Sequence, residues 1–204
     1  MASFNQVTKS KKRKLPQNPK QTSSKATKMN KDCNIFEEHL GKDIFVVVNT
    51  FQHESLIHIR KYDVDGDKIF PTKTGACLTL SRWKQFVIQL DEIDTSLKKS
   101  CNNEDVEYQF HLGGNWHVSV SRGYYCVDIR KFWLPENEKE IVPSRKGIDL
   151  GPSEFRELKR LTGSIEDQLP ELAEIVPCMM REDPQNQLGA LQCSECNPND
   201  FQNW

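Results

Sequence analysis

Residues 127–133 read Val-Asp-Ile-Arg-Lys-Phe-Trp, and residues 143–150 read Pro-Ser-Arg-Lys-Gly-Ile-Asp-Leu. The Ile-Arg-Lys of this stretch recurs at residues 59–61, and its Pro-Ser-Arg-Lys-Gly corresponds to Pro-Thr-Lys-Thr-Gly at residues 71–75. The offset is 70 residues at the first motif and 72 at the second, so the motifs keep their order while the loops between them change length. Loops absorb such changes at little cost. A repeat of this length indicates two copies of one small domain rather than a solenoid.

Hydrophobic patterning predicts four antiparallel strands followed by one amphipathic helix in each copy. The protein is therefore expected to be an α+β protein with two tandem small domains. Thr79 is a suitable N-cap for the first helix, Pro152 fits the first turn of the second, and Gly163 is expected to kink the second. The expected strands are residues 44–48, 56–62, 68–70, 116–120, 125–133 and 141–142, and the apolar stripes of the helices run over residues 83–97 and 155–169.

Charge and composition divide the 204-residue chain into four parts. Residues 1–34 form a basic arm with little to bury, and we expect this arm to be disordered. The diverged first copy occupies residues 35–100, the second copy occupies residues 106–170, and residues 171–204 form an acidic, cysteine-containing tail that is also expected to be disordered. A basic arm on nearly neutral domains is typical of a tether for a polyanion, although it can also be a merely soluble tail.

The sequence favours a nuclear protein. Lys11, Lys12, Arg13 and Lys14 form a basic cluster of the kind that directs nuclear import. The chain begins with charged and polar residues and contains no apolar run of about eighteen residues, so neither a secretory signal nor a membrane span is expected. Seven scattered cysteines in such a chain indicate reduced thiols in the cytosol or the nucleus.

The ordered motifs of the second copy resemble the positive cofactor four family. These proteins are RNA polymerase II transcriptional coactivators with a C-terminal domain that binds single-stranded DNA. The resemblance covers the whole second copy through residues 118–120, 127–133, 143–150 and 152–155, and the first copy is similar but more diverged. It implies a curved four-stranded sheet followed by a helix, with dimerisation through the helices. It also implies that DNA crosses the outward sheet face, with bases on aromatic side chains and phosphates on Arg and Lys.

The resemblance assigns a nucleic-acid-binding surface to the second copy. Trp133 corresponds to the stacking aromatic residue, Arg130 to the basic strand residue, residues 145–147 to the phosphate loop, and Arg122 and Tyr124 to the hairpin loop. In that phosphate loop of Arg145, Lys146 and Gly147, the glycine is expected to let the backbone approach a phosphate. Simple strand alternation puts Trp133 and Arg130 on opposite faces, which would suit a core tryptophan. A bulge near the end of the strand would bring both to one side.

The first copy keeps less of this surface. It retains Phe51 in the hairpin, Arg60 on the strand and Lys73 in the phosphate loop, but Asp63 stands where the second copy has its tryptophan. A carboxylate that faces phosphates weakens binding. We therefore predict that the second copy binds the strand and that the first is a degenerate structural copy. The short linker predicts that the two copies pair through their helices within one chain, with a homodimer as the alternative.

Other chemistry finds little support in the sequence. Cys193 and Cys196 form half of a zinc site and Cys178 offers a third thiol, but a structural zinc site takes four ligands, so disordered tail thiols without a metal are the favoured interpretation. No nucleophile elbow or nucleotide-binding loop is present, so we expect neither an enzyme nor a cofactor. Two hypotheses stay open: a DNA-binding coactivator that contacts the transcription machinery, and a protein-interaction scaffold that no longer binds DNA.

Overall fold

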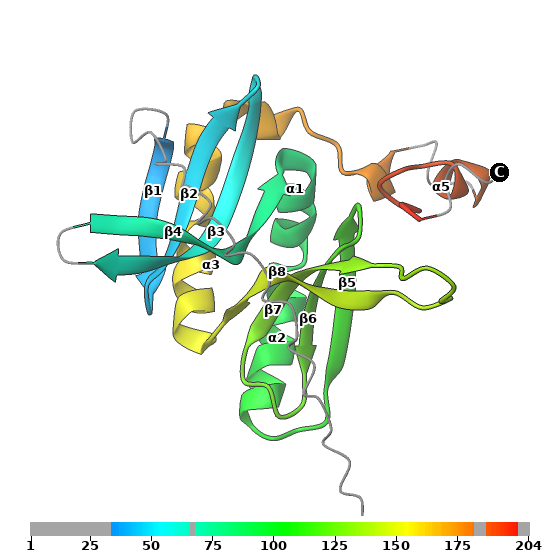
Figure 1. Ribbon diagram of the computed structural model, residues 1–204, viewed down its shortest axis with the longest axis horizontal. Helices are drawn as coiled ribbons and strands as arrows, with labels where there is room; N and C mark the ends of the chain where they lie inside the picture. Colours follow the sequence, from blue (N-terminus) through cyan, green and yellow to red (C-terminus); the bar gives the residue numbers. More distant parts are fainter. Residues whose placement is uncertain (1–33, 66–67, 182–186, 200–204) are drawn as a thin grey trace, which may run out of the picture.

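The computed structural model describes residues 34–65, 68–181 and 187–199, and these contain two four-stranded antiparallel sheets (Figure 1). In both sheets the strands lie in the order in which they follow along the chain. The first sheet contains β1 (Asn34–Gly41), β2 (Ile44–Phe51), β3 (Glu54–Asp65) and β4 (Lys68–Thr79), and the second contains β5 (Glu107–Gly113), β6 (Trp116–Ser121), β7 (Val127–Trp133) and β8 (Val142–Leu150). The predicted α+β fold with two tandem copies is confirmed. The basic arm and its nuclear localisation cluster lie outside the described residues.

The helix of the first copy is broken, whereas that of the second is continuous. The break separates α1 (Leu80–Ile88) from α2 (Leu90–Cys101) at Gln89, and the second copy has α3 (Pro152–Gln168). Thr79 is the predicted N-cap, and its side chain accepts a hydrogen bond from Arg82 N at 3.5 Å. Gly163 does not break the helix: it is exposed within the continuous α3, and buried residues lie on both sides of it.

The two copies exchange their helices. In the packed structure α3 lies against β1 and β2 of the first sheet, and α2 lies against β5 and β6 of the second. The break at Gln89 allows this arrangement, since α1 contacts β3 and β4 of its own sheet as well as β5 of the second, while α2 continues along the second sheet. Lys159 on α3 forms ion pairs with Asp91 and Asp94 on α2 at 3.0 and 3.1 Å. One hydrophobic core, which includes the fully buried Trp83 and Phe155, therefore serves both copies.

Long hairpins extend from the middle of the molecule, where β4 and β8 contact each other. The β3–β4 hairpin and the β7–β8 hairpin project in opposite directions (Figure 1). The short fourth strands predicted at residues 68–70 and 141–142 are parts of much longer strands, except that β8 begins at Val142 rather than residue 141, because Gly75 and Gly147 do not end the strands. They pair instead with Arg60 and Arg130 of the preceding strands.

The C-terminal tail has defined structure in the residues described. It contains η2 (Pro170–Ala173), η3 (Cys178–Met180) and the short helix α5 (Gln187–Leu191). The expectation of a disordered tail is therefore wrong for these residues, because Leu172 and Cys178 are buried and bring the chain back onto the folded body. None of the helices in the described residues is long and apolar enough to cross a membrane.

Candidate nucleic-acid interface

A bulge interrupts the last hairpin of each sheet. In the second copy Arg130 pairs with Gly147 and Phe132 pairs with Pro143. More residues of β8 than of β7 therefore lie between these two pairs, and the extra residues of β8 form the bulge. The first copy has the same irregularity in β4, where the pairing moves from Arg60 and Gly75 to Tyr62 and Pro71. The bulge expected near the end of the strand is therefore confirmed, and the predicted phosphate loop forms the bulged segment.

The bulge of the second copy presents two cations to solvent. Arg145 and Lys146 are both exposed on β8. No ion pair among the described residues involves either side chain. Their charges are thus available to an anion that approaches the hairpin.

Trp133 lies at the end of β7 and is 49% exposed. Phe132, the residue before it, packs edge-on against His117 on the sheet face of Arg130, with ring centroids 4.7 Å apart. Because about half of the Trp133 side chain is exposed, the core alternative for this residue is excluded. The indole instead stands on the same hairpin as the bulged cations and can accept a flat ring on its open face.

The hairpin loop between β6 and β7 exposes a second aromatic group. Tyr124 is 70% exposed, and Arg122 in the same loop is also exposed, with a loose ion pair to Asp105 at 3.9 Å. The loop is held from below by the helix of the other copy. Ser100 Oγ on α2 lies 3.1 Å from Ser121 O and 3.2 Å from Tyr124 O and donates to this pair of carbonyls.

Arg130 is fixed in place by three groups. Its Nε donates to Asp128 at 2.8 Å, its Nη2 donates to Asp149 at 3.1 Å, and its Nη1 donates to Ser144 O at 3.2 Å. Burial raises the pKa of Asp128, although the adjacent guanidinium favours its carboxylate form. Hydrogen bonding to Asp128 in turn raises the pKa of Arg130. The guanidinium therefore braces the start of the bulge, and two carboxylates share its charge.

Arg60 holds the bulge of the first copy in the same way, but no carboxylates flank it there. Its Nη1 donates to Thr72 O at 3.1 Å, while His58 and Cys77 occupy the positions of Asp128 and Asp149. Within the described part of the chain Arg60 forms no ion pair, and its buried Nε lacks a hydrogen-bond partner. Burial, together with the charge of Arg60, lowers the pKa of His58 to about 4.

The remaining candidate residues of the first copy are spread along its hairpins. Phe51 is 61% exposed at the end of β2, and Lys73 is exposed in the bulge. Tyr62 is buried against Phe45, with ring centroids 4.9 Å apart, and this contact corresponds to that of Phe132 with His117 in the second copy. Asp63 is exposed in the position of the tryptophan.

Gly147 is required by strand packing. A Cβ at this position would lie 2.8 Å from Ile129 O, and Gly75 has the same relation to Ile59 O. Such contacts are closer than a side chain tolerates, so the glycine allows β8 to approach β7. Close packing against the neighbouring strand thus accounts for this glycine, and the approach of a phosphate stays a prediction.

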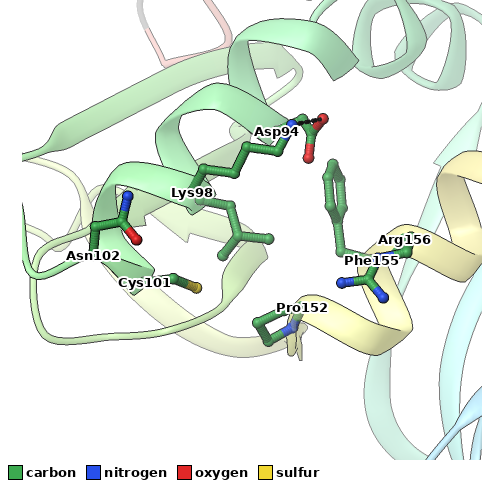
Figure 2. Close-up of a pocket in the computed structure, with 8 residues that line it drawn as sticks. Asp94, Lys98, Cys101, Asn102, Pro152, Phe155 and Arg156 are labelled. Carbon is green, nitrogen blue, oxygen red and sulfur yellow. Dashed lines mark hydrogen bonds and ion pairs between the residues drawn. The ribbon is translucent and has the colours of Figure 1, made fainter.

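A hollow of about 360 Å³ lies in the helix layer between α2 and the start of α3. Figure 2 shows Pro152 and Phe155 of α3 facing Lys98 and Cys101 of α2. Two of its lining residues, Asp94 and Lys98, form an ion pair at 3.0 Å. The lining provides no nucleophile with a base beside it, so it does not compete with the hairpins as a functional site.

The protein is thus a tandem α+β protein whose two copies exchange their helices. Each copy has one open sheet face and exposed side chains at a bulged hairpin. The family described as Transcriptional Coactivator p15 (PC4) matches residues 39–88 and 110–161, one segment in each copy. The chain belongs to this family.

Two similar proteins illustrate the match. A Caenorhabditis elegans protein that bears the name of an RNA polymerase II transcriptional coactivator is 32% identical over 78 residues, which is 37% of this chain and 60% of the relative. The chain thus spans about three fifths of that relative's length. The crystal structure of a MoSub1–DNA complex is 21% identical, covers 39% of this chain and 99% of its own, and has a TM-score of 0.32.

Proposed function

We propose that this protein is a nuclear, non-catalytic transcriptional coactivator that acts with RNA polymerase II and binds single-stranded or unwound DNA mainly through its second copy. The observation that carries the proposal is the half-exposed Trp133 on the same hairpin as the exposed cations Arg145 and Lys146. Membership of the coactivator family and the name of the Caenorhabditis elegans relative support the transcriptional role.

Stacking and charge supply the binding. Unpaired bases stack on Trp133 and Tyr124, and each base–aromatic contact is worth about 1–3 kcal/mol. Arg145, Lys146 and Arg122 neutralise phosphates, and the release of counterions makes this part of the affinity depend on salt. Because every base has a flat face and every nucleotide has a phosphate, the surface discriminates strandedness rather than sequence.

Arg130 acts mainly as a positioning residue in this scheme. Its hydrogen bond to Ser144 O holds the bulge that carries the two exposed cations, while Asp128 and Asp149 offset its charge. In the first copy Phe51, Arg60 and Lys73 offer a weaker surface. That copy has one cation in its bulge and the carboxylate of Asp63 where a base would stack.

The basic arm adds affinity that does not depend on sequence. Residues 1–31 carry eight lysines, one arginine and no acid, and the cluster from Lys11 to Lys14 provides the import signal. Since the exchanged helices bury their apolar stripes within one chain, we propose that the protein works as an intramolecular pseudo-dimer of 23.6 kDa. A concentration-independent monomer in solution supports this, and a stable species of twice the mass contradicts it.

One observation favours a second candidate function. Asp128 and Asp149 place two carboxylates on the outward face of the second sheet, where they repel phosphates. A protein-interaction scaffold that has lost DNA affinity would tolerate these acids. Such a scaffold has no need for exposed Trp133, Arg145 and Lys146, which is why the DNA-binding function is preferred.

Binding of oligonucleotides separates the two functions. The full chain is titrated with single-stranded and duplex oligonucleotides of the same sequence over a range of salt concentrations. We expect tighter binding to the single strand, with an affinity that falls as salt rises. A triple variant, Trp133→Ala with Arg145→Ala and Lys146→Ala, is the matched comparison. Equal binding of single strand and duplex, or no effect of the triple variant, contradicts the proposed function.

A further inference from the structure

Three cysteines of the tail meet at one point. Cys178 lies in η3, and Cys193 and Cys196 lie in the turn after α5. The three Sγ atoms lie within 4.8 Å of one another, and Cys178 Sγ is 2.9 Å from Cys193 Sγ and 3.2 Å from Cys196 Sγ. Cys178 is buried and the other two are half-buried. The sequence interpretation of these residues as disordered tail thiols is therefore wrong.

The arrangement has the character of a metal centre. Two cysteines separated by two residues present their sulfurs from one turn, and a third from a separate segment closes the group, as in zinc sites. The Sγ distances exceed the length of about 2.05 Å that a disulfide requires, and a disulfide would leave one of the three sulfurs over. Thiolates are the ligands that select zinc over the harder divalent cations.

The three sulfurs are crowded at this turn, since Cys178 Sγ lies 2.9 Å from Cys193 Sγ and 3.2 Å from Cys196 Sγ. Three closely packed sulfurs cannot all carry negative charge without a cation, and a divalent metal ion removes that conflict.

The cysteine turn also joins the tail to both copies. Glu195, between two of the cysteines, forms an ion pair with Arg82 of α1 at 2.8 Å. Its carbonyl oxygen accepts a hydrogen bond from Gly114 N, in the β5–β6 turn, at 2.9 Å. Asn199 exchanges side-chain hydrogen bonds with Asn115 of the same turn at 3.0 and 3.1 Å. Whatever fixes the cysteine turn therefore fixes the tail on the second sheet.

We propose that Cys178, Cys193 and Cys196 form a structural centre for Zn²⁺ that holds the C-terminal tail against the β5–β6 turn. The described residues supply three of the four ligands that tetrahedral zinc takes. A hollow of about 380 Å³ adjoins Cys178 and Cys196 and is also lined by residues of β5, and the proposal includes a water molecule from this hollow as the fourth ligand. The centre includes none of the proposed DNA-binding residues, and the proposal does not depend on DNA binding.

The full chain, purified with reducing agent and loaded with Zn²⁺, tests the centre. We expect about one zinc ion per chain, which Cys193→Ser and Cys178→Ser lose and the matched control Cys101→Ser keeps. Cys193 is half-buried, so its variant separates loss of metal from loss of fold. Replacement of zinc by Co²⁺ should give the absorption of a tetrahedral site with thiolate charge-transfer bands, and these bands should disappear in the Cys193→Ser variant.

Hydrogen exchange tests whether the metal holds the tail. The Gly114 amide donates to Glu195 O, so it should lose protection when a chelator removes zinc, while amides in β2 and β3 keep theirs. The proposal is overturned if zinc content is the same in the cysteine variants and the control. It is equally overturned if the reduced chain binds no zinc, or if Gly114 protection is indifferent to the chelator.

Discussion

The two copies share one backbone feature, an arginine that holds a bulge, but neutral side chains flank this arginine in the first copy and carboxylates flank it in the second. In both, a strand arginine donates to the first carbonyl of a bulge, Thr72 O in the first copy and Ser144 O in the second. The first copy flanks this arginine with His58 and Cys77, and the second flanks it with Asp128 and Asp149. The hydrogen bond from the arginine to the bulge is therefore a structural feature of both copies. The residue at the end of the hairpin, Trp133 or Asp63, distinguishes the copies in function.

Trp133→Ala gives the largest expected effect on this comparison. The change removes one stacking platform and should reduce single-strand affinity by about 1–3 kcal/mol. Phe51→Ala is the matched control, because Phe51 is an exposed aromatic residue on a hairpin of the first copy. Titration of both variants with one oligonucleotide at fixed salt measures the difference. Equal losses would mean that the copies share the strand.

The bulged cations give the next effect. Replacement of both Arg145 and Lys146 by Ala should lower the dependence of log affinity on log salt by about 1.4, since each phosphate contact with a single strand contributes about 0.7. Lys73→Ala in the first copy should leave the slope nearly unchanged. A fall in slope of the same size per charge in both copies would show that the first bulge also contacts phosphates.

Acid should weaken the fold through the first sheet face, where His58 stands in the position of Asp128. The unfolded His58 takes up a proton as pH falls below about 6.5, but burial delays this in the folded protein until about 4. The free energy of unfolding should therefore fall as pH decreases through this window. One histidine contributes at most about 1.4 kcal/mol per pH unit, and its partial exposure reduces this figure.

Urea unfolding at several pH values checks the role of His58. His58→Gln removes the titrating ring and should flatten the pH dependence, while His53→Gln changes an exposed histidine of the same sheet and should not. If both variants keep the pH dependence of the natural chain, another group causes the acid sensitivity. One such group is His111 of the second copy, because burial lowers its pKa to about 4.

The smallest expected effect comes from the acids of the second sheet. Asp149→Asn should strengthen single-strand binding by about 0.2–1 kcal/mol, the usual range for an exposed charge pair, because Arg130 then has more charge to offer a phosphate. Asp167→Asn makes the same charge change on the exposed end of α3 and serves as the control. Equal gains from both variants would mean that only net charge matters.

The sequence predicted the parts of the fold that depend on local pattern. The repeat located the two copies, and Thr79 marked the start of α1. Strand alternation put Trp133 and Arg130 on opposite faces, and this conflict with the resemblance predicted the bulge. The helix break at Gln89 was missed, because no glycine or proline marks it. It follows from the exchange of helices between the copies, which is a tertiary effect.

The candidate site was predicted unevenly for the same reason. Exposed aromatic and basic residues could be placed by their motifs, but Asp128 and Asp149 could not be linked to Arg130 until the register of β7 and β8 was known. They are directly paired across the two strands, which a correct alignment of the hairpin would have shown. The three tail cysteines were noted in the sequence but interpreted as disordered thiols, because Cys178 is separated from the other two and meets them only when the tail folds back.

Ultraviolet cross-linking of a bound single-stranded oligonucleotide, followed by peptide mass mapping, tests most directly whether the second copy carries strand binding. Stacked aromatic side chains react readily, so each contact is reported at its own residue. We expect cross-links at Trp133 and Tyr124, and their loss at high salt as the strand dissociates. Cross-links confined to Phe51 and the β3–β4 hairpin would contradict the proposed asymmetry between the copies.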